Sequence, residues 1–204
     1  MSALADEQQE HDALREIVNV AMGQAADSLA RLFKTFVKLP VPRVRQVNAD
    51  QMVDSIREIL GDHGKVTAVR QGFSGPMHGE ALVIFDAAGC SELAELLGYA
   101  AEAHNEDELL LDVANVLTGA CLGGIARQLS YELSFSPPSI LVNRGSLDQL
   151  LDPSRPLPWR TALLVEVNFR IEDRAFRCHI FVFYPEAAME RLNQSIEAFL
   201  EELG

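Results

Sequence analysis

The chain has 204 residues, and its 48% hydrophobic content is enough to bury the core of one domain without disulfide bonds. Thirty acidic residues against seventeen lysines and arginines give a formal net charge of −13, which repels both a phosphate backbone and an anionic bilayer. Because the acidic start has no basic and apolar leader, and no later run approaches the roughly 18 uncharged apolar residues of a membrane span, we expect a cytoplasmic protein without nucleic-acid or membrane partners.

Apolar periodicity and turn residues predict five elements in the first half of the chain. Two prolines followed by alternating valines indicate that a long helix gives way to a strand. Gly61 caps a short helix, and a hairpin with a Gly/Pro/Ser turn comes next. The predicted elements are a helix from residue 12, a strand over 39–47, a helix over 52–61, a hairpin over 65–86 and a helix over 90–103.

The second half repeats this order with a clearer hairpin. Strand-like alternation flanks Glu172 and Asp173, and Pro185 and Gly204 bound a closing helix. The predicted elements are a helix from residue 108, a strand after it, a loop-like connection over 143–160, a hairpin over 160–185 and a helix over 185–204.

An internal duplication accounts for this recurrence. Shifting the sequence by 96 positions places Asn19 on Asn115 and Gly23 on Gly119. Val20, Ala30, Arg31 and Pro42 likewise fall on Val116, Ala126, Arg127 and Pro138. We therefore expect a single domain, 1–204, built of two repeats at about 8–103 and 104–204.

Each long helix has one polar stripe and one apolar stripe. At about 100° per residue, Asp12, Glu16 and Asn19 share a face, and Glu108, Asp112 and Asn115 share the matching face of the second helix. The opposite faces carry Leu14, Ile17, Val18, Ala21, Ala25, Leu29, Leu32 and Phe36 in the first helix, and Leu110, Ala114, Leu117, Cys121 and Ile125 in the second. The helices are therefore expected to bury one side and display the other.

Small residues extend both polar stripes beyond the asparagine. They are Gly23, Ala26, Asp27 and Ala30 in the first helix, and Gly119, Gly123 and Ala126 in the second. Solvated helix faces normally carry long side chains, and glycine there costs about 1 kcal/mol relative to alanine. Two interpretations stay open: another helix of this chain packs closely on the stripe, as the GxxxG spacing of "GACLG" indicates, or a partner docks on it.

The acid–acid–amide set also has an ordinary interpretation. On one helix alone, Asp12 is a first-turn acid, and Glu16 and Asn19 belong to a solvated face. The second set has the same spacing and the same phase to the core, and proline again follows asparagine by 23 positions. This recurrence favours a functional surface.

Cysteines and histidines show no spacing typical of a metal site. Cys90, Cys121 and Cys178 form no CxxC pair, and none of the five histidines lies in an HExxH pattern. We expect buried, reduced thiols and assign no metal to this chain.

At the two polar sets the sequence resembles the CheC/CheX/FliY family of chemotaxis phosphatases. The family signature is Asp or Ser, three residues, Glu, two residues, Asn, twenty-two residues and Pro. The first copy matches at every position, with Asp12, Glu16, Asn19 and Pro42. In the second copy Asn115 and Pro138 fit, Glu108 stands in the Asp/Ser place and Asp112 in the Glu place. Two signatures in one chain are most similar to CheC.

The resemblance implies an α/β, two-layer fold with pseudo-twofold symmetry, in which two long exposed helices pack on a β-sheet. It implies a phosphatase that hydrolyses the aspartyl phosphate of a CheY-like response regulator. Asn19 and Asn115 would orient the attacking water, and Glu16 would pair with the regulator's active-site lysine. Asp12 and Glu108 would support the surface, while Pro42 would end the helix. This chain would bind no cofactor, since the Mg²⁺ belongs to the response regulator.

The second copy departs from the signature at one position that matters for this chemistry. Asp112 is one methylene shorter than glutamate, so its carboxylate falls short of the partner lysine by on the order of 1 Å. We therefore predict that the first site is the stronger one.

Other function classes are weighed against the phosphatase. A weakly catalytic or non-catalytic adaptor that binds a response regulator or CheD, a receptor deamidase, is the main alternative. A hydrolase with paired acid and base carboxylates is disfavoured, because carboxylates one turn apart on an open helix face have no enclosed pocket and no contrast in pKa. A purely structural homodimer is a further alternative.

Overall fold

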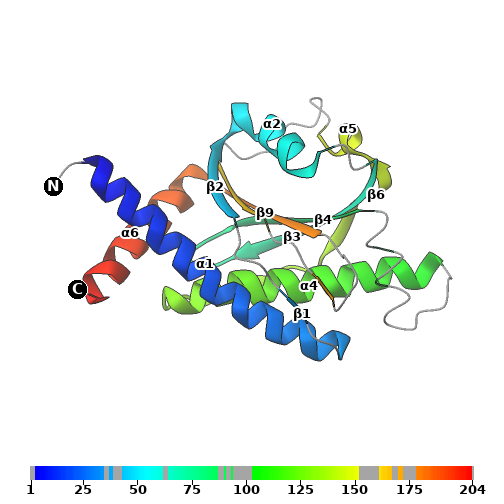
Figure 1. The fold of residues 1–204 in the computed structure, drawn as a ribbon, viewed down its shortest axis with the longest axis horizontal. Helices are drawn as coiled ribbons and strands as arrows, with labels where there is room; N and C mark the ends of the chain where they lie inside the picture. The colour runs from blue at the N-terminus through cyan, green and yellow to red at the C-terminus, as the bar shows by residue number, and fades with distance from the viewer. Residues whose placement is uncertain are drawn as a thin grey trace.

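The computed structural model describes residues 3–34, 37–38, 43–61, 64–86, 90, 93, 103–151, 161–166, 170–171 and 178–203. A seven-stranded antiparallel sheet lies at its centre, with long helices against one face and short helices against the other (Figure 1). The long helices are α1 (Ala3–Phe33), α4 (Ala103–Gln128) and α6 (Glu186–Leu203), and the short ones are α2 (Ala49–Leu60) and α5 (Leu147–Leu150).

The sheet has the order β2-β7-β9-β4-β3, and the free edge of β3 is shared by β5 and β6. Its strands are β2 (Arg43–Asn48), β3 (Lys65–Ser74), β4 (Gly79–Asp86), β5 (Ser134–Phe135), β6 (Ser139–Ser146), β7 (Thr161–Glu166) and β9 (Cys178–Tyr184). A separate two-stranded ladder joins β1 (Val37–Lys38) to β8 (Arg170–Ile171).

The two halves of the chain exchange strands across this sheet. Strand β2 of the first half pairs with β7 of the second, and β6 of the second half pairs with β3 of the first. The starts of β2 and β6, at Arg43 and Ser139, are 96 residues apart, and so are those of β3 and β7. Lys34 and Ser130, which follow α1 and α4 at the same separation, both have positive φ, 51° and 57°. The expected pseudo-twofold arrangement is therefore confirmed.

Two apolar cores lie on opposite faces of the sheet. The larger core packs α1, α4 and α6 against one face and includes Ile17, Val18, Leu117, Cys121 and Ile180. The smaller core packs α2 and α5 against the other face through residues such as Met52, Ile56 and Phe181. The expected layer of long helices on a sheet is present, and the short helices add a cover on the opposite face.

Most predicted elements are present, and three need comment. The hairpin over 65–86 is β3–β4, and the strands of the second hairpin pair as β7 and β9, although its turn lies outside the described residues. Of the helix predicted over 90–103, only Cys90 and Leu93 are described before α4 begins, and both are helical. The connection over 143–160 is not wholly a loop, since it contains α5.

The short helix α5 forms because of a local capping box. The Ser146 hydroxyl accepts from the Gln149 backbone N–H at 3.3 Å, and the Gln149 side chain accepts from the Ser146 N–H at 3.0 Å. These bonds satisfy donors that a short helix would otherwise leave open. The expectation that Pro42 ends the first helix is wrong, because α1 ends at Phe33, and Pro42 itself lies outside the described residues.

One described helix is long and apolar enough to cross a membrane by length and composition alone, although charged residues interrupt it. It is the segment Glu106–Gln128 of α4, and most of it is buried inside the fold. Burial against α1 and the sheet explains its apolar character, because core helices are hydrophobic over most of their surface.

Candidate functional site

The first polar set lies on the exposed face of α1. Asp12, Glu16 and Asn19 are all exposed, whereas Ile17 and Val18 between them are buried. Arg15 lies 3.8 Å from the Asp12 carboxylate, a solvent-exposed pair of little energetic weight. Within the described part of the chain, Glu16 and Asn19 make no side-chain hydrogen bond or ion pair. Their polar groups are therefore available to a partner.

The helix surface beyond Asn19 carries a glycine and is partly apolar. Val20 is 38% exposed, although it is a large hydrophobic residue. Gly23 is exposed, and a Cβ added to it would meet no atom within 4 Å. The small residue thus leaves open space above the helix, so the backbone can be approached closely there.

The second polar set occupies the matching face of α4. Glu108, Asp112 and Asn115 are exposed, and a Cβ added to Gly119 would meet nothing within 4 Å. The two sites differ at the asparagine. The Gln71 side-chain amide donates through Nε2 to Asn115 Oδ1 at 2.7 Å. Asn115 therefore starts from a fixed position, which the described contacts do not give Asn19.

The two long helices cross each other at a glycine that is not part of the small stripe. A Cβ added to Gly124 would lie 2.7 Å from Ala21 Cβ and 2.8 Å from Ala21 Cα, so the helix backbones are in direct contact. By contrast, a Cβ on Gly123 would meet only the Arg127 guanidinium, at 3.5 Å. Helix packing therefore explains Gly124 but not Gly119 and Gly123. Ala126, the last residue of the predicted stripe on α4, is 2% exposed, so docking stays an interpretation for the part of the stripe at Gly119 and Gly123 and does not apply to Ala126.

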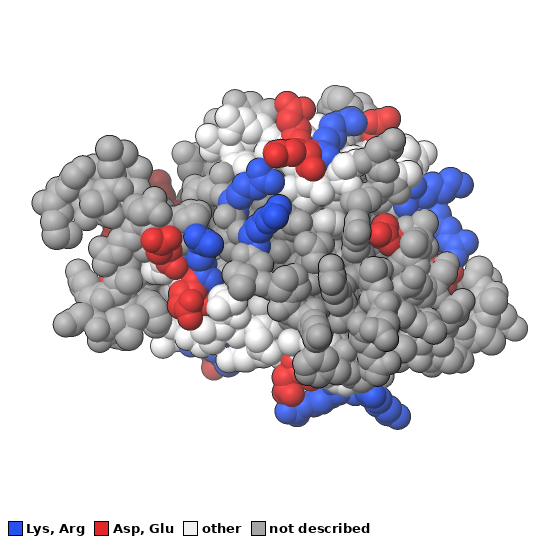
Figure 2. Space-filling model, viewed as in Figure 1, with Lys and Arg blue, Asp and Glu red and all other residues white. Residues whose placement is uncertain are grey.

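Charge on the viewed surface is mixed. Figure 2 shows acidic and basic side chains interspersed over the described part of this face. Among the described residues, Asp27–Arg31 and Asp148–Arg57 are exposed ion pairs, both at 2.7 Å. Arg127 of α4 also donates to the Gln24 side chain of α1, which ties the two helices together on their outer side.

The cysteines are unsuited to nucleophilic catalysis. All three are free and buried, as expected from the sequence. Burial raises the pKa of the Cys121 thiol from 9.0 to about 12. Burial, with Glu106 and Asp86 nearby, raises the pKa of Cys90 to about 12 as well. A thiol reacts as its thiolate, and these environments suppress the thiolate.

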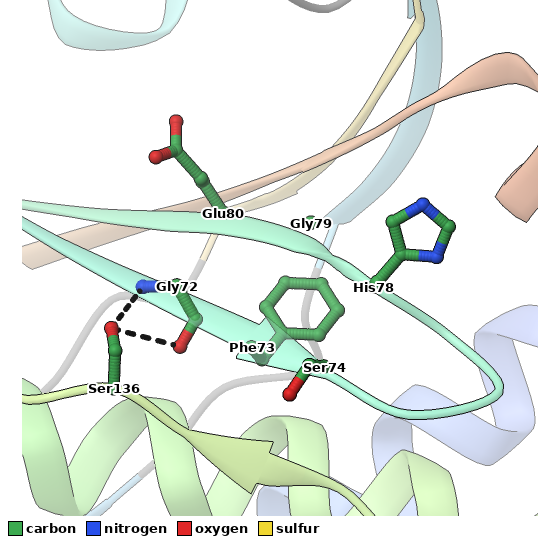
Figure 3. Close-up of a pocket in the computed structure, with 7 residues that line it drawn as sticks. All are labelled: Gly72, Phe73, Ser74, His78, Gly79, Glu80 and Ser136. Atoms are coloured by element: carbon green, nitrogen blue, oxygen red, sulfur yellow. Dashed lines mark hydrogen bonds between the residues drawn. The ribbon is translucent and has the colours of Figure 1, made fainter.

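An open hollow of about 440 Å³ lies at the end of the β3–β4 hairpin, and none of its lining residues belongs to the signature (Figure 3). Its lining residues are Gly72, Phe73, Ser74, His78, Gly79, Glu80 and Ser136. The Ser136 hydroxyl bonds to the Gly72 backbone, while the Glu80 and His78 side chains point away from it. This arrangement brings no nucleophile and base together, so we assign the hollow no chemistry.

Metal-binding geometry is likewise lacking where the chain is described. In that part, no three histidine, cysteine or acidic side chains are placed so that they could hold an ion.

Gln71 is a site residue that no sequence motif indicated. Strand alternation places residue 71 on the same side of β3 as Val69 and Phe73, both of which belong to the larger core. A glutamine in an apolar register position was the available signal, because such a side chain is buried only with hydrogen-bond partners.

No family model matches the chain, but solved structures do. It is similar to FliY from Thermotoga maritima, with a TM-score of 0.71 and 17% identity over 93% of this chain and 96% of that one. CheX from Desulfovibrio desulfuricans gives a TM-score of 0.52 and 12% identity, covering 83% of this chain and 99% of that one. FliM in a FliG–FliM complex from H. pylori gives a TM-score of 0.61 and 12% identity, covering 91% of this chain and 97% of that one. The chain has the fold of these proteins, as the signature led us to expect.

Proposed function

We propose that this chain, with its CheC/CheX/FliY fold, is a chemotaxis phosphatase that hydrolyses the aspartyl phosphate of a CheY-like response regulator. The observation that carries the proposal is the surface formed by Glu16 and Asn19. Both are exposed on a helix whose other side is held in the core, and neither has a side-chain partner in the described part of the chain. Gly23 leaves open space beside them.

The chemistry needs little more than such a surface. An acyl phosphate is already activated, and the regulator carries its own Mg²⁺, so the phosphatase mainly has to place water in line with phosphorus. The Asn19 amide can both accept from and donate to that water. Glu16, one turn before it, would attract the regulator's active-site lysine. Because Ile17 and Val18 are buried, the helix presents both groups from a rigid base.

The second polar set offers the same groups in weaker form. Asp112 has the shorter carboxylate, and Asn115 is already engaged by Gln71. We therefore assign most of the hydrolysis to the first site.

The decay of a phosphorylated receiver domain, measured with and without this protein, tests the proposal. We expect faster phosphate loss with the wild-type chain and no acceleration with the Asn19→Ala, Asn115→Ala double variant. Both side chains are exposed, but Asn115 accepts a hydrogen bond from the buried Gln71 amide, so the circular dichroism spectrum and the unfolding transition of the double variant are the controls for its folding. Unchanged dephosphorylation by the double variant would refute the enzymatic role.

An adaptor role is the second candidate, and the likeness to FliM favours it. The FliM neighbour was solved in complex with FliG, so this fold also occurs in a protein whose described partner is another protein. An adaptor would bind a phosphorylated regulator, CheD or a switch component without hydrolysis. Binding measured by calorimetry separates the two roles, because an adaptor retains binding while receiver phosphate decays at its intrinsic rate.

A further inference from the structure

Gln71 is a buried polar residue whose side chain reaches the second signature asparagine. It is 2% exposed and lies on the side of β3 that faces the larger core. A primary amide in such a place is costly unless its groups are hydrogen-bonded. Its Nε2 donates to the Ser136 backbone carbonyl at 2.9 Å and to Asn115 Oδ1 at 2.7 Å.

These two bonds fix the orientation of both amides. A backbone carbonyl only accepts hydrogen bonds, so the end of Gln71 that faces Ser136 must be the NH₂ group. The same nitrogen faces Asn115, and the Asn115 atom nearest to it must therefore be the oxygen. As a result, Asn115 keeps the two N–H groups of Nδ2 for a partner, while its oxygen is engaged.

The anchor for this arrangement is a stiff part of the chain. The Ser136 backbone N–H donates to the Gly72 carbonyl at 3.0 Å, and the Ser136 hydroxyl accepts from the Gly72 N–H at 3.0 Å. Pro137 and the signature residue Pro138 follow, and a residue before proline is restricted to extended backbone. Pro138 is thus connected to Asn115 through the Ser136 carbonyl and Gln71.

The cost of this arrangement is visible at the other end of Gln71. Its Oε1 is buried and finds no hydrogen-bond partner in the described structure. A residue kept only for packing would not leave a buried acceptor open, since an apolar side chain of similar length fills the same space without that penalty. The donor end is therefore what the fold uses.

Among the described residues, none holds Asn19 in this way. By the 96-residue repeat, the position that matches Gln71 is Val167, which lies outside the described residues and whose side chain has no donor. Asn19 keeps both ends of its amide free within the described contacts.

We propose that Gln71 is a positioning residue that locks the Asn115 amide with its nitrogen outward, so that the second site acts as a fixed hydrogen-bond donor toward the phosphoryl oxygens of the receiver rather than as a water-orienting group. The fixed orientation of the Asn115 amide is a property of the free protein, whereas its role in receiver binding rests on the proposed function. The two sites thereby have different roles, since Asn19 orients water and Asn115 recognises the anionic group.

Nuclear magnetic resonance of the full-length, ¹⁵N-labelled protein tests the lock without any receiver. We expect the ¹⁵N relaxation of the Asn115 Nδ2 group to show that it is rigid relative to the protein. The Asn19 Nδ2 group should be mobile and is the control in the same spectrum. The resonances are assigned from their loss in Asn115→Ser and Asn19→Ser. In Gln71→Met, which has similar length and no donor, the Asn115 group should become as mobile as that of Asn19. Equal mobility of the two groups in the wild-type protein would overturn the proposal and requires no variant to fold.

Binding of a beryllofluoride-activated receiver domain then tests the use of the lock. In the Asn19→Ala background, Gln71→Met should weaken binding about 3-fold to 10-fold, the range expected for one hydrogen bond. In the Asn115→Ala background the same change should have no further effect. An equal loss in both backgrounds would mean that Gln71 has a general structural role and would overturn the donor role. Absence of receiver binding by the wild-type chain would instead count against the proposed function and leave the relaxation result standing.

Discussion

Asn19 and Asn115 hold matching places in the sequence but differ in their contacts, and this predicts unequal contributions to hydrolysis. Asn19 has both ends of its amide available among the described contacts, whereas Gln71 holds the oxygen of Asn115. We expect Asn19→Ala to slow receiver dephosphorylation about 100-fold, the effect of losing a group that places a reactant, and Asn115→Ala to slow it less. Phosphate decay under single-turnover conditions gives both rates. A larger loss at Asn115 would contradict the assignment.

A second residue-scale prediction concerns the buried thiol of Cys121 in α4. Burial raises its pKa from 9.0 to about 12, so the folded state holds the proton more tightly than the unfolded chain. Its contribution to stability is therefore complete below pH 9 and is lost as pH rises from 9 to 12, with a slope that approaches about 1.4 kcal/mol per pH unit. Urea unfolding at about pH 8 to 10.5 should show a smaller decline for Cys121→Ala than for the wild-type protein. Parallel declines would show that this thiol does not titrate on unfolding.

At the scale of elements, the crossing of α1 and α4 depends on one missing side chain. A Cβ on Gly124 would lie 2.7 Å from Ala21 Cβ, closer than packed atoms allow. We expect Gly124→Ala to force the helices apart and to lower the free energy of unfolding by about 1–3 kcal/mol. Gly119→Ala is the matched control in the same helix, because its Cβ would meet nothing within 4 Å. We expect this variant to raise the free energy of unfolding by about 1 kcal/mol, since alanine favours the helix over glycine. Chemical denaturation gives the free energy of unfolding of both variants. Equal values would mean that the two helices can move apart at the crossing without loss of stability.

The sequence predicts the features that depend on neighbouring residues and misses those that depend on contacts between distant segments. The buried stripe of α1 and the β3–β4 hairpin depend on local periodicity, and both were predicted. The pairing of β2 with β7 joins distant segments, and no local pattern specifies it. The Gln71–Asn115 hydrogen bond joins residues 44 positions apart, so only the apolar register of Gln71 hinted at it.

For the whole molecule, the exchange of strands makes each half dependent on the other. Within the first half, β3 and β4 pair with each other, but the partner of β2 among the described strands is β7 of the second half. Within the second half, β7 pairs with β9, but β5 and β6 both pair with β3. An isolated hairpin is at most marginally stable, and the long helices bury their apolar stripes largely against each other and the shared sheet.

A cut of the chain between residues 103 and 104 tests this dependence. We expect neither fragment, 1–103 or 104–204, to unfold cooperatively as a monomer, because each lacks the partner strands and the helix that cover its core. Mixed together, the fragments should form a one-to-one complex with a single thermal transition, since all interactions between the halves are non-covalent and no disulfide links the three free cysteines. Light scattering gives the stoichiometry and differential scanning calorimetry the transition. A fragment that unfolds cooperatively as a monomer would show instead that one repeat carries a complete core, and the strand exchange would then add stability without being required for folding.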